Sequence, residues 1–157
     1  MISRALTSDL PDLARLMAGS SLLQRYGVSY ASALASLSDA LWSGDLVLAI
    51  GETDLHGLAW MSFGPGILNG AAYLRLLLVA APGQGDGRRL LVAAEGEARR
   101  RANHVYLLAT TDNVKARRFY ERHGYRYVGD LPDLVRPGLD EALYHKTLRP
   151  LDDRVTA

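Results

Sequence analysis

The feature of this sequence with the strongest structural consequence is a glycine-rich segment between two patterns of apolar residues. An apolar run at residues 74–81 ends just before the segment, and an amphipathic pattern begins just after it, at Leu90. The segment itself reads Gly83-Gln84-Gly85-Asp86-Gly87-Arg88-Arg89. Glycine adopts backbone conformations that other residues avoid, and the amides at a helix N-terminus attract anions. The segment therefore predicts a strand, a tight turn that binds a phosphorylated ligand, and a helix.

The spacing of the segment excludes two common phosphate-binding motifs. A P-loop requires Lys and then Ser or Thr after its last glycine, but Gly87 is followed by Arg88 and Arg89. A dinucleotide fingerprint that starts at Gly83 requires a third glycine at the position of Arg88. The loop alone also leaves open a simple connection between a strand and a helix, without a ligand.

Length and composition favour one globular domain. A chain of 157 residues is long enough to bury about 70% of its unfolded surface, and we expect a single domain at residues 1–150 with a tail at 151–157. The sequence contains no cysteine, which excludes disulfides and thiolate chemistry. No long apolar run marks a signal peptide or a membrane span, so we expect a cytoplasmic protein without membrane partners.

The charge is nearly balanced but unevenly distributed. A net charge of +1 argues against general binding to nucleic acid. Residues 81–127, which surround the glycine-rich segment, hold ten Lys/Arg against five Asp/Glu. The run Arg99-Arg100-Arg101 is interpreted as a solvated helix face.

Apolar spacing and turn residues predict a mixed α+β fold with elements in the order β-α-α-β-β-β-α-β-α-β-β. Helices are expected at residues 9–18 and 29–42, from residue 90 onward, and at residues 113–122. Strands are expected at residues 1–6, 46–50, 56–63, 72–80, 105–109, 125–129 and 142–148. Residues 131–138, rich in Pro and Gly, are predicted to form a loop. The helix that begins near residue 90 should connect two parallel strands.

Two segments, in this order of elements, resemble the GCN5-related N-acetyltransferase (GNAT) superfamily. Residues 79–91 resemble its pyrophosphate loop. Residues 113–125 resemble its Asn-x-x-Ala, then Tyr-x-x-x-Gly-Phe/Tyr pattern, through Asn113, Ala116, Tyr120, Gly124 and Tyr125. The resemblance covers nearly the whole chain.

The resemblance implies both a fold and an activity. The fold is a central, mostly antiparallel mixed sheet with a parallel, splayed pair of middle strands, flanked by helices on both faces. The splayed strands would be the one that ends near Val79 and the one that starts near Val105. The activity is that of an acetyl-CoA-dependent N-acetyltransferase, an acyltransferase that moves an acetyl group to a primary amine by direct attack on the thioester. No metal is implied.

Coenzyme A contacts are implied at three places. The amides from Gly83 to Arg88 would hold the pyrophosphate, and the backbone of residues 77–79 would pair with the pantetheine arm. Asn113 would meet the pantetheine, cap the following helix, or do both. The full set is Leu77, Leu78, Val79, Gly83, Gln84, Gly85, Asp86, Gly87, Arg88, Arg89, Asn113, Ala116 and Phe119.

For catalysis, the resemblance implies that Tyr120 is the general acid toward the leaving thiolate. The backbone amide of Leu78 or Val79 would stabilise the oxyanion. The general base is not evident, because Arg75 is on the strand where many relatives carry a glutamate. The candidates by their chemistry alone are Glu52, Asp112, Glu141 and His145. Deprotonation through water, or an amine that arrives already neutral, is equally open.

The acceptor is expected to be a small amine, an amino-acid-like compound or a peptide N-terminus. Aromatic side chains suit the wall of such a pocket, and a histidine suits proton transfer. The candidate pocket residues are Tyr26, Tyr30, Trp60, Tyr73 and His145. Proteins of this appearance also often form homodimers.

Two departures from the pattern of the family motivate an alternative function. Pro82 occupies a usual Arg or Gln position and has no amide proton, and the carboxylate of Asp86 would oppose a pyrophosphate unless it is paired. A non-catalytic module that binds or senses an acyl-CoA is therefore the alternative. An unrelated nucleotide-binding α/β protein is a third hypothesis.

Overall fold

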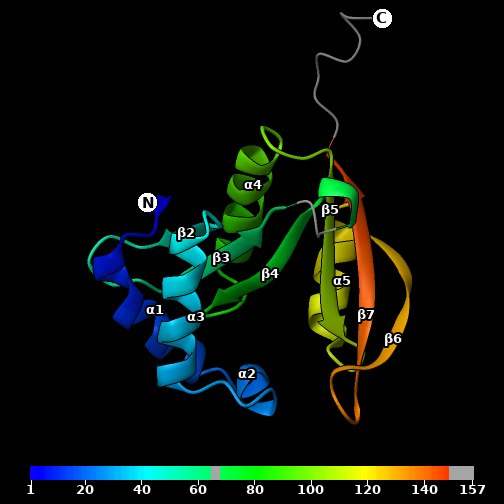
Figure 1. Ribbon diagram of the computed structural model, residues 1–157, viewed down its shortest axis with the longest axis horizontal. Coiled ribbons are helices and arrows are strands. Elements are labelled where there is room, and N and C mark those ends of the chain that lie inside the picture. Colours follow the sequence, from blue (N-terminus) through cyan, green and yellow to red (C-terminus); the bar gives the residue numbers. More distant parts are fainter. Residues whose placement is uncertain (65–67, 149–157) are drawn as a thin grey trace, which may run out of the picture. The chain divides into compact units, whose positions relative to one another are not determined.

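The computed structural model describes residues 1–64 and 68–148, and the elements are labelled in Figure 1. The strands are β1 (Ile2–Arg4), β2 (Leu46–Ile50), β3 (Gly57–Ser62), β4 (Ala72–Val79), β5 (His104–Thr110), β6 (Arg126–Arg136) and β7 (Leu139–Thr147). The α-helices are α1 (Leu10–Ala18), α2 (Ser21–Arg25), α3 (Tyr30–Trp42), α4 (Asp86–Ala98) and α5 (Val114–Arg122). Two 3-10 turns are η1 (Thr7–Asp9) and η2 (Leu68–Gly70).

The strands form one seven-stranded sheet in the order β1-β2-β3-β4-β5-β7-β6. The pair β4–β5 is parallel, whereas β1–β2, β2–β3, β5–β7 and β6–β7 are antiparallel. This confirms the predicted mixed α+β fold with a mostly antiparallel sheet. The chain divides into two compact units, one of residues 1–62 and 75–97, the other of residues 63–74 and the described part of 98–157. The predicted domain limit at residue 150 and the tail at 151–157 lie outside the described residues.

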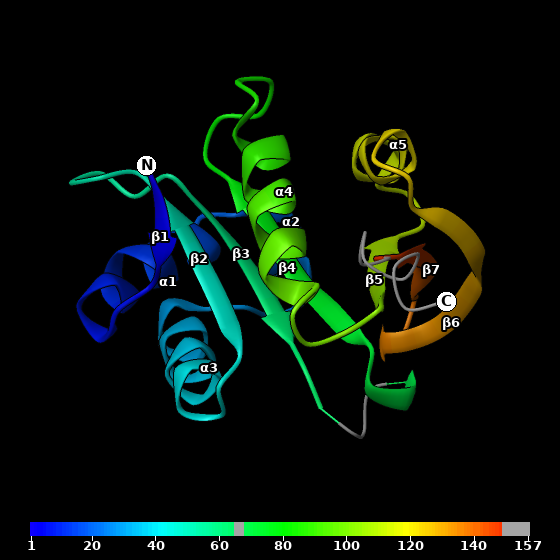
Figure 2. The ribbon, with the colours of Figure 1, turned by 90° about the horizontal axis from the view of Figure 1, so that it is seen from above.

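The first unit buries both faces of β2 and β3. All five residues of β2 are buried, and alternate side chains of a strand point to opposite faces. Val47 and Ala49 belong to the core that β2 and β3 share with α1 and α3, and α4 covers the opposite face (Figure 2). A continuous apolar strand is therefore the pattern that this position requires.

Gly57 on β3 lies close to β2, β4 and α4. A Cβ at this position would be 2.9 Å from Ile50 Cγ2, 2.9 Å from the carbonyl oxygen of Leu78 and 3.1 Å from Leu90 Cδ1. The carbonyl belongs to the backbone and cannot move without disturbing β4. The absence of a side chain at Gly57 is therefore needed for this packing.

We expect Gly57→Ala to lower the free energy of unfolding by about 1–3 kcal/mol, as other overpacked cores do. Gly96, within α4, is the matched control, because a Cβ there meets no atom within 4 Å. Gly96→Ala should raise stability by about 0.5–1 kcal/mol through helix propensity. Urea unfolding of both variants measures the difference, and equal effects of the two substitutions would contradict this account of Gly57.

The N-termini of α3 and α1 agree with the predictions from the sequence to different degrees. α3 begins as predicted: Ser29 and Ser32 form a capping box, with Ser29 Oγ accepting from Ser32 N at 3.1 Å and Ser32 Oγ accepting from Ser29 N at 2.9 Å. Asp9 is at the N-cap of α1, but its carboxylate accepts from Leu6 N at 2.8 Å instead of from an amide inside the helix. Asp9 therefore occupies the N-cap position of α1 without a side-chain hydrogen bond to the helix.

In the second unit, the predicted loop at residues 131–138 is wrong. β6 extends through this segment and pairs with β7, and only Pro137 and Gly138 connect the two strands. Register shifts interrupt the pairing, and Asp133 has a φ of 53°. Pro132 is tolerated because β6 is the edge strand of the sheet. Pairing with β7 thus overrides the local turn propensity.

α5 packs on one face of β5 and β7 and makes a part-buried polar contact with β7 (Figure 2). The hydroxyl of Tyr144, which is 0% exposed, accepts from Arg117 Nε at 3.0 Å and donates to Glu121 Oε1 at 2.9 Å. Arg117 also donates to the carbonyl oxygen of Thr111 at 2.9 Å. Because the hydroxyl of Tyr144 and the Arg117 guanidinium both have partners, this interior contact fixes α5 on the sheet.

Candidate functional site

The glycine-rich segment forms an exposed loop that leads into α4. Gly83 and Gly85 have φ angles of 89° and 84°, a region that glycine adopts without strain. A Cβ added at either position meets no atom within 4 Å. The carbonyl oxygen of Gly85 accepts from Arg89 N at 3.1 Å, so the first helical hydrogen bond starts at this glycine. α4 therefore begins four residues earlier than the predicted start at Leu90.

This start leaves the first-turn amides of α4 available to an anion. The amides of Asp86, Gly87 and Arg88 precede the first donor that has an acceptor within the helix. The helix dipole and the exposed side chains of Arg88 and Arg89 add positive potential around them. Pro82 lies outside this turn, so its missing amide proton does not remove these donors. The first turn of α4 therefore presents backbone donors of the kind that bind anions.

The carboxylate of Asp86 lies beside two other side chains, those of His56 and Arg89. Its Oδ2 is 3.3 Å from Nε2 of His56, and its Oδ1 is 3.2 Å from an Nη atom of Arg89. Only 16% of the Asp86 side chain is exposed. The Asp86 carboxylate is therefore paired with Arg89, which is the condition under which the sequence allowed a carboxylate beside a phosphate.

β4, the strand before the loop, packs against the core of the first unit and lies between β3 and β5 in the sheet. Leu76 and Leu78 pack against the core of the first unit, while Leu77 and Val79 are half-buried. The amide of Ala80, just past β4, donates to the carbonyl oxygen of His56 at 2.7 Å. The parallel register with β5 covers the other end of β4, from Ala72 to Leu74.

In the second unit, Asn113 is the N-cap of α5. Its side-chain oxygen accepts from Ala116 N at 3.2 Å, which confirms the capping role of Asn113. Its contact with pantetheine stays a prediction. Phe119 is half-buried and packs edge-to-face on Tyr120, with ring centroids 5.3 Å apart.

Tyr120 is 8% exposed and lies between the rings of Phe119 and Tyr125. Burial raises the pKa of the Tyr120 hydroxyl well above its ordinary value, so the phenol keeps its proton at neutral and mildly alkaline pH. Among residues 1–64 and 68–148, no hydrogen-bond partner of this hydroxyl is found. The Tyr120 hydroxyl is thus protonated and donates no hydrogen bond to the described residues.

The candidate acceptor residues are divided between the two units: Tyr26, Tyr30 and Trp60 belong to the first, and Tyr73 and His145 to the second. Trp60 is only 9% exposed, and its indole N–H donates to Asp45 Oδ2 at 2.9 Å. Tyr30 is 40% exposed at the start of α3.

Trp60 is part of a polar network that the sequence did not reveal. Ser62, which is buried, donates to the same Asp45 oxygen at 2.8 Å and accepts from Arg75 Nε at 2.6 Å. The Arg75 guanidinium carbon is 5.4 Å from the centre of the Trp60 ring. Arg75 is thus held on the first unit by hydrogen bonding and by a cation–π contact.

His145 forms a pair with His104 on neighbouring strands. Nε2 of His145 is 2.8 Å from Nδ1 of His104, and the ring of Tyr106 lies 4.8 Å from that of His145. Burial, followed by the nearby His104, lowers the pKa of His145. His145 is therefore neutral at pH 7 and chemically able to accept a proton.

The remaining candidates for a general base differ in burial. Glu52 and Asp112 are exposed, whereas Glu141 is 3% exposed on β7.

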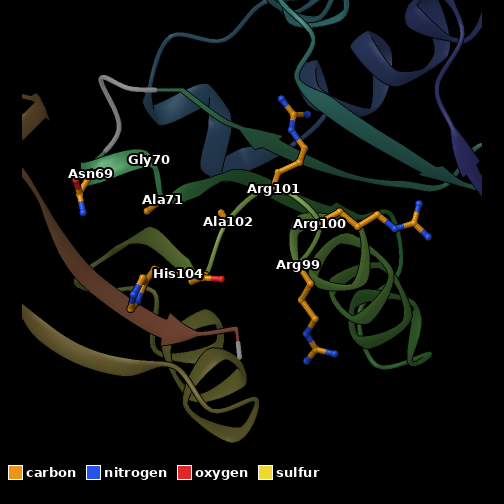
Figure 3. A pocket seen from close by; sticks show the side chains of 9 residues that line it. Asn69, Gly70, Ala71, Arg99, Arg100, Arg101, Ala102 and His104 are labelled. Carbon is orange, nitrogen blue, oxygen red and sulfur yellow. The ribbon is translucent and has the colours of Figure 1, made fainter. Parts of the chain in front are cut away.

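A pocket of about 400 Å³ lies in the second unit, where η2 meets the turn between α4 and β5. The lining residues are Asn69, Gly70, Ala71, Arg99, Arg100, Arg101, Ala102, Asn103 and His104. The three arginine side chains point in different directions (Figure 3), and the Arg101 guanidinium stacks on Phe63 at 3.8 Å. They follow α4, which ends at Ala98, so the prediction that they form a helix face is wrong. Their guanidinium groups do not converge on one ligand.

No helix within the described ranges is long and apolar enough to cross a membrane.

The comparisons with known proteins identify the family. The model of the acetyltransferase (GNAT) family matches residues 34–125, more than half of the chain. The chain therefore belongs to the GNAT acetyltransferase family, as the resemblance in its sequence implied. No curated protein matches it.

Solved structures share the fold along almost the whole chain. Ribosomal-protein-alanine N-acetyltransferase from Brucella melitensis is 20% identical, with a TM-score of 0.78 over 94% of this chain and 99% of its own. YncA from Salmonella typhimurium, with its cofactor acetyl-CoA, is 19% identical, with a TM-score of 0.77 over 95% of this chain and 94% of its own. An aminoglycoside 6'-N-acetyltransferase in complex with coenzyme A is 19% identical, with a TM-score of 0.75 over 98% and 99%.

Proposed function

We propose that this protein is an acetyl-CoA-dependent N-acetyltransferase that transfers an acetyl group to a primary amine by direct attack on the thioester. The observation that carries the proposal is the start of α4 at Asp86, directly after Gly85, which leaves the first-turn amides available to an anion within a member of the GNAT family. Structural neighbours that contain acetyl-CoA or coenzyme A support the same cofactor.

The proposed coenzyme site is built mainly from backbone. The amides from Gly83 to Arg88 would hold the pyrophosphate, with Arg88 and Arg89 adding charge. The backbone of residues 77–79 would pair with pantetheine, and Asn113 would contact it while it caps α5. Binding through the main chain makes affinity depend on loop conformation more than on individual side chains.

Bound acetyl-CoA would supply an acetyl group that an amine nitrogen attacks, with loss of the coenzyme thiolate. The amide of Val79 would donate a hydrogen bond to the acetyl oxygen as negative charge develops on it. Tyr120 would donate its proton, or a hydrogen bond, to the departing sulfur. The raised pKa of Tyr120 keeps the proton on the phenol until the thiolate forms.

For the acceptor, we propose a small amine, an amino-acid-like compound or a peptide N-terminus. Exposed Tyr30 and half-buried Tyr26 and Tyr73 could provide the aromatic walls. The neutral His145 would be suited to take the proton that the amine must lose.

Calorimetry with acetyl-CoA and with coenzyme A, followed by turnover with a panel of amines, tests the proposal. We expect both coenzymes to bind and at least one amine of the three acceptor classes to be acetylated, as measured by release of free thiol. Binding without transfer to any amine would favour the acyl-CoA-sensing module instead. No binding of either coenzyme, with tight binding of ATP or NAD, would reject both.

A further inference from the structure

Arg75 has no part in the function proposed above, yet it lies on the strand whose backbone would pair with pantetheine. On β4 it precedes Leu77 by two residues, which span about 7 Å in an extended strand. The loop that would hold the pyrophosphate, residues 83–88, follows the other end of the strand. Pantetheine that runs from this loop along residues 79 to 77 would therefore carry its thioester toward Arg75.

The side chain of Arg75 is held by two residues of β3. Its Nε donates to Ser62 Oγ at 2.6 Å, and its guanidinium carbon is 5.4 Å from the centre of the Trp60 ring. Trp60 belongs to the core that β2 and β3 share with α1 and α3, so the Arg75 side chain lies toward this face of the sheet. Arg75 as a whole is nevertheless exposed to solvent.

The direction of the hydrogen bond between Arg75 and Ser62 follows from Asp45. Oδ2 of Asp45 accepts from Ser62 Oγ at 2.8 Å and from Trp60 Nε1 at 2.9 Å. Because the single hydroxyl proton of Ser62 is donated to the carboxylate, the hydroxyl oxygen meets Arg75 as an acceptor. Asp45 thus orients both residues that hold Arg75. All four residues belong to the first unit, together with the glycine-rich loop.

These contacts orient a group that is suited to carboxylate recognition. A guanidinium is planar, stays charged at any working pH and has five N–H donors in a rigid fork. The contact with Ser62 uses the Nε–H and sets the plane of the fork, whereas the two Nη atoms form another edge of it. Two parallel N–H groups on such an edge match the two oxygens of a carboxylate.

We propose that Arg75 selects the acceptor: its guanidinium binds a carboxylate of the substrate, which makes the acceptor an amino-acid-like compound rather than a simple amine or the N-terminus of a peptide. This inference rests on the proposed function, because it concerns the amine that would be acetylated. The separation of about 7 Å between Arg75 and Leu77 suits a small molecule that carries its amine and its carboxylate close together. A cationic group in the same place would be repelled by the guanidinium.

Ser62 is then a positioning residue, since it acts on the acceptor through Arg75. Without the Ser62 hydroxyl, the long side chain of Arg75 has to be ordered by the substrate. The cost of immobilising one such side chain corresponds to about a two- to tenfold loss of affinity. Ser62→Ala should therefore weaken the recognition of the carboxylate, but less than the loss of the guanidinium does.

The experiment measures acetylation of the common amino acids, each paired with its carboxamide and with the corresponding simple amine. An acid and its carboxamide share the same side chain and differ at the carboxylate. The amine of the carboxamide is less basic, but this difference is the same for every protein variant. The measured quantity is therefore the ratio of kcat/KM for the acid to kcat/KM for the carboxamide, compared among variants.

The proteins compared are the wild type, Arg75→Gln, Arg75→Lys, Ser62→Ala and a control, Arg101→Gln. Arg101 is also an exposed arginine stacked on an aromatic ring, with its guanidinium carbon 3.8 Å from the centre of the Phe63 ring, but it belongs to the second unit. Thermal unfolding and calorimetry with acetyl-CoA check that each variant is folded and binds the coenzyme.

We expect the wild type to acetylate at least one amino acid with a higher kcat/KM than its carboxamide. Arg75→Gln should lower kcat/KM for the acid by about 10- to 100-fold, the effect of a hydrogen-bonded charge pair, mainly through KM. The value for the carboxamide should change little. Arg75→Lys should recover part of the loss, because it keeps the charge without the fork. Arg101→Gln should keep the wild-type ratio.

Equal kcat/KM of the wild type for acids and carboxamides would overturn the inference, and this comparison needs no variant to fold. An equal loss for acid and carboxamide in folded Arg75→Gln would overturn it as well, since a purely structural residue gives that result. Acetylation of peptides alone would do the same. All three leave the proposed function standing, because an amine is still acetylated. Binding of acetyl-CoA without transfer to any amine would reject the proposed function and the role of Arg75 together.

Discussion

Replacing Tyr120 by phenylalanine is expected to lower turnover by roughly 100-fold or more, the usual contribution of a general acid, with little change in acetyl-CoA affinity. The hydroxyl has no partner among the described residues, so its loss removes no hydrogen bond from the fold. Stability should therefore change by less than about 1 kcal/mol. A steady-state assay with the best amine of the panel, together with calorimetry and thermal unfolding, separates these effects.

The pH dependence sharpens this test. Because the pKa of Tyr120 is raised by burial, the neutral phenol is favoured in the folded protein. Turnover of the wild type should show no loss from Tyr120 ionisation up to about pH 10, the ordinary pKa of tyrosine. The stability that this burial contributes is fully present below about pH 10 and is lost as the pH rises through the higher folded value.

Tyr125→Phe is the matched control, since Tyr125 is also buried and its ring centre is 5.6 Å from that of Tyr120. Its turnover should stay close to that of the wild type, after correction for the folded fraction. Equal turnover of Tyr120→Phe and the wild type across the pH range would remove the role assigned to Tyr120.

Gly85→Val should weaken acetyl-CoA binding by about 10- to 100-fold, which corresponds to the loss of one hydrogen bond to a charged group. At a φ of 84° a β-branched residue is strained, so the turn would shift away from its present geometry. In the coenzyme-free protein, a Cβ at position 85 has no atom within 4 Å, so the side chain of valine extends from an open position. The space that they enter is the one proposed for the phosphates.

Gly138→Val provides the control for the strain itself. Gly138 has the same φ of 84°, and a Cβ there also meets no atom within 4 Å. Both variants should lose a similar amount of stability in urea unfolding, but only Gly85→Val should lose coenzyme affinity. If the affinity survives in Gly85→Val, the loop assignment is wrong.

The elements that could be predicted from the sequence are those with a continuous local signal. β2 was predicted at its observed bounds because five apolar residues in a row suit a strand buried on both faces. α3 was predicted because Ser29 marks its start and Gly44 follows its end. In both cases, the residues that form the element also carry its pattern.

The errors occur where a tertiary contact decides the structure. The sequence did not predict α2, because its five residues are too few to show a helical period. The first turn of α4 contains Gly87 and no apolar residue, so the hydrophobic pattern begins a turn too late. β6 carries Pro132, which locally favours a loop, and only its pairing with β7 makes it a strand.

The candidate site also contains features that could be predicted from the sequence and features that could not. The spacing of Gly83 and Gly85 predicted the turn before α4, because the turn needs these residues locally. The contact of His56 with Asp86 could not be found, because it joins positions far apart in the chain. The network of Asp45, Ser62 and Arg75 was missed for the same reason.

The irregularity of β6 has a consequence for how this protein could associate with copies of itself. An exposed edge strand can pair with a strand of another molecule. On β6, the exposed apolar residues are Val128, Leu134 and Val135. Pro132 lacks a donor, and the left-handed backbone at Asp133 breaks the ladder that an incoming strand would need. Two molecules that meet along this border would therefore have to associate through side chains, because continuous main-chain pairing is blocked at its midpoint.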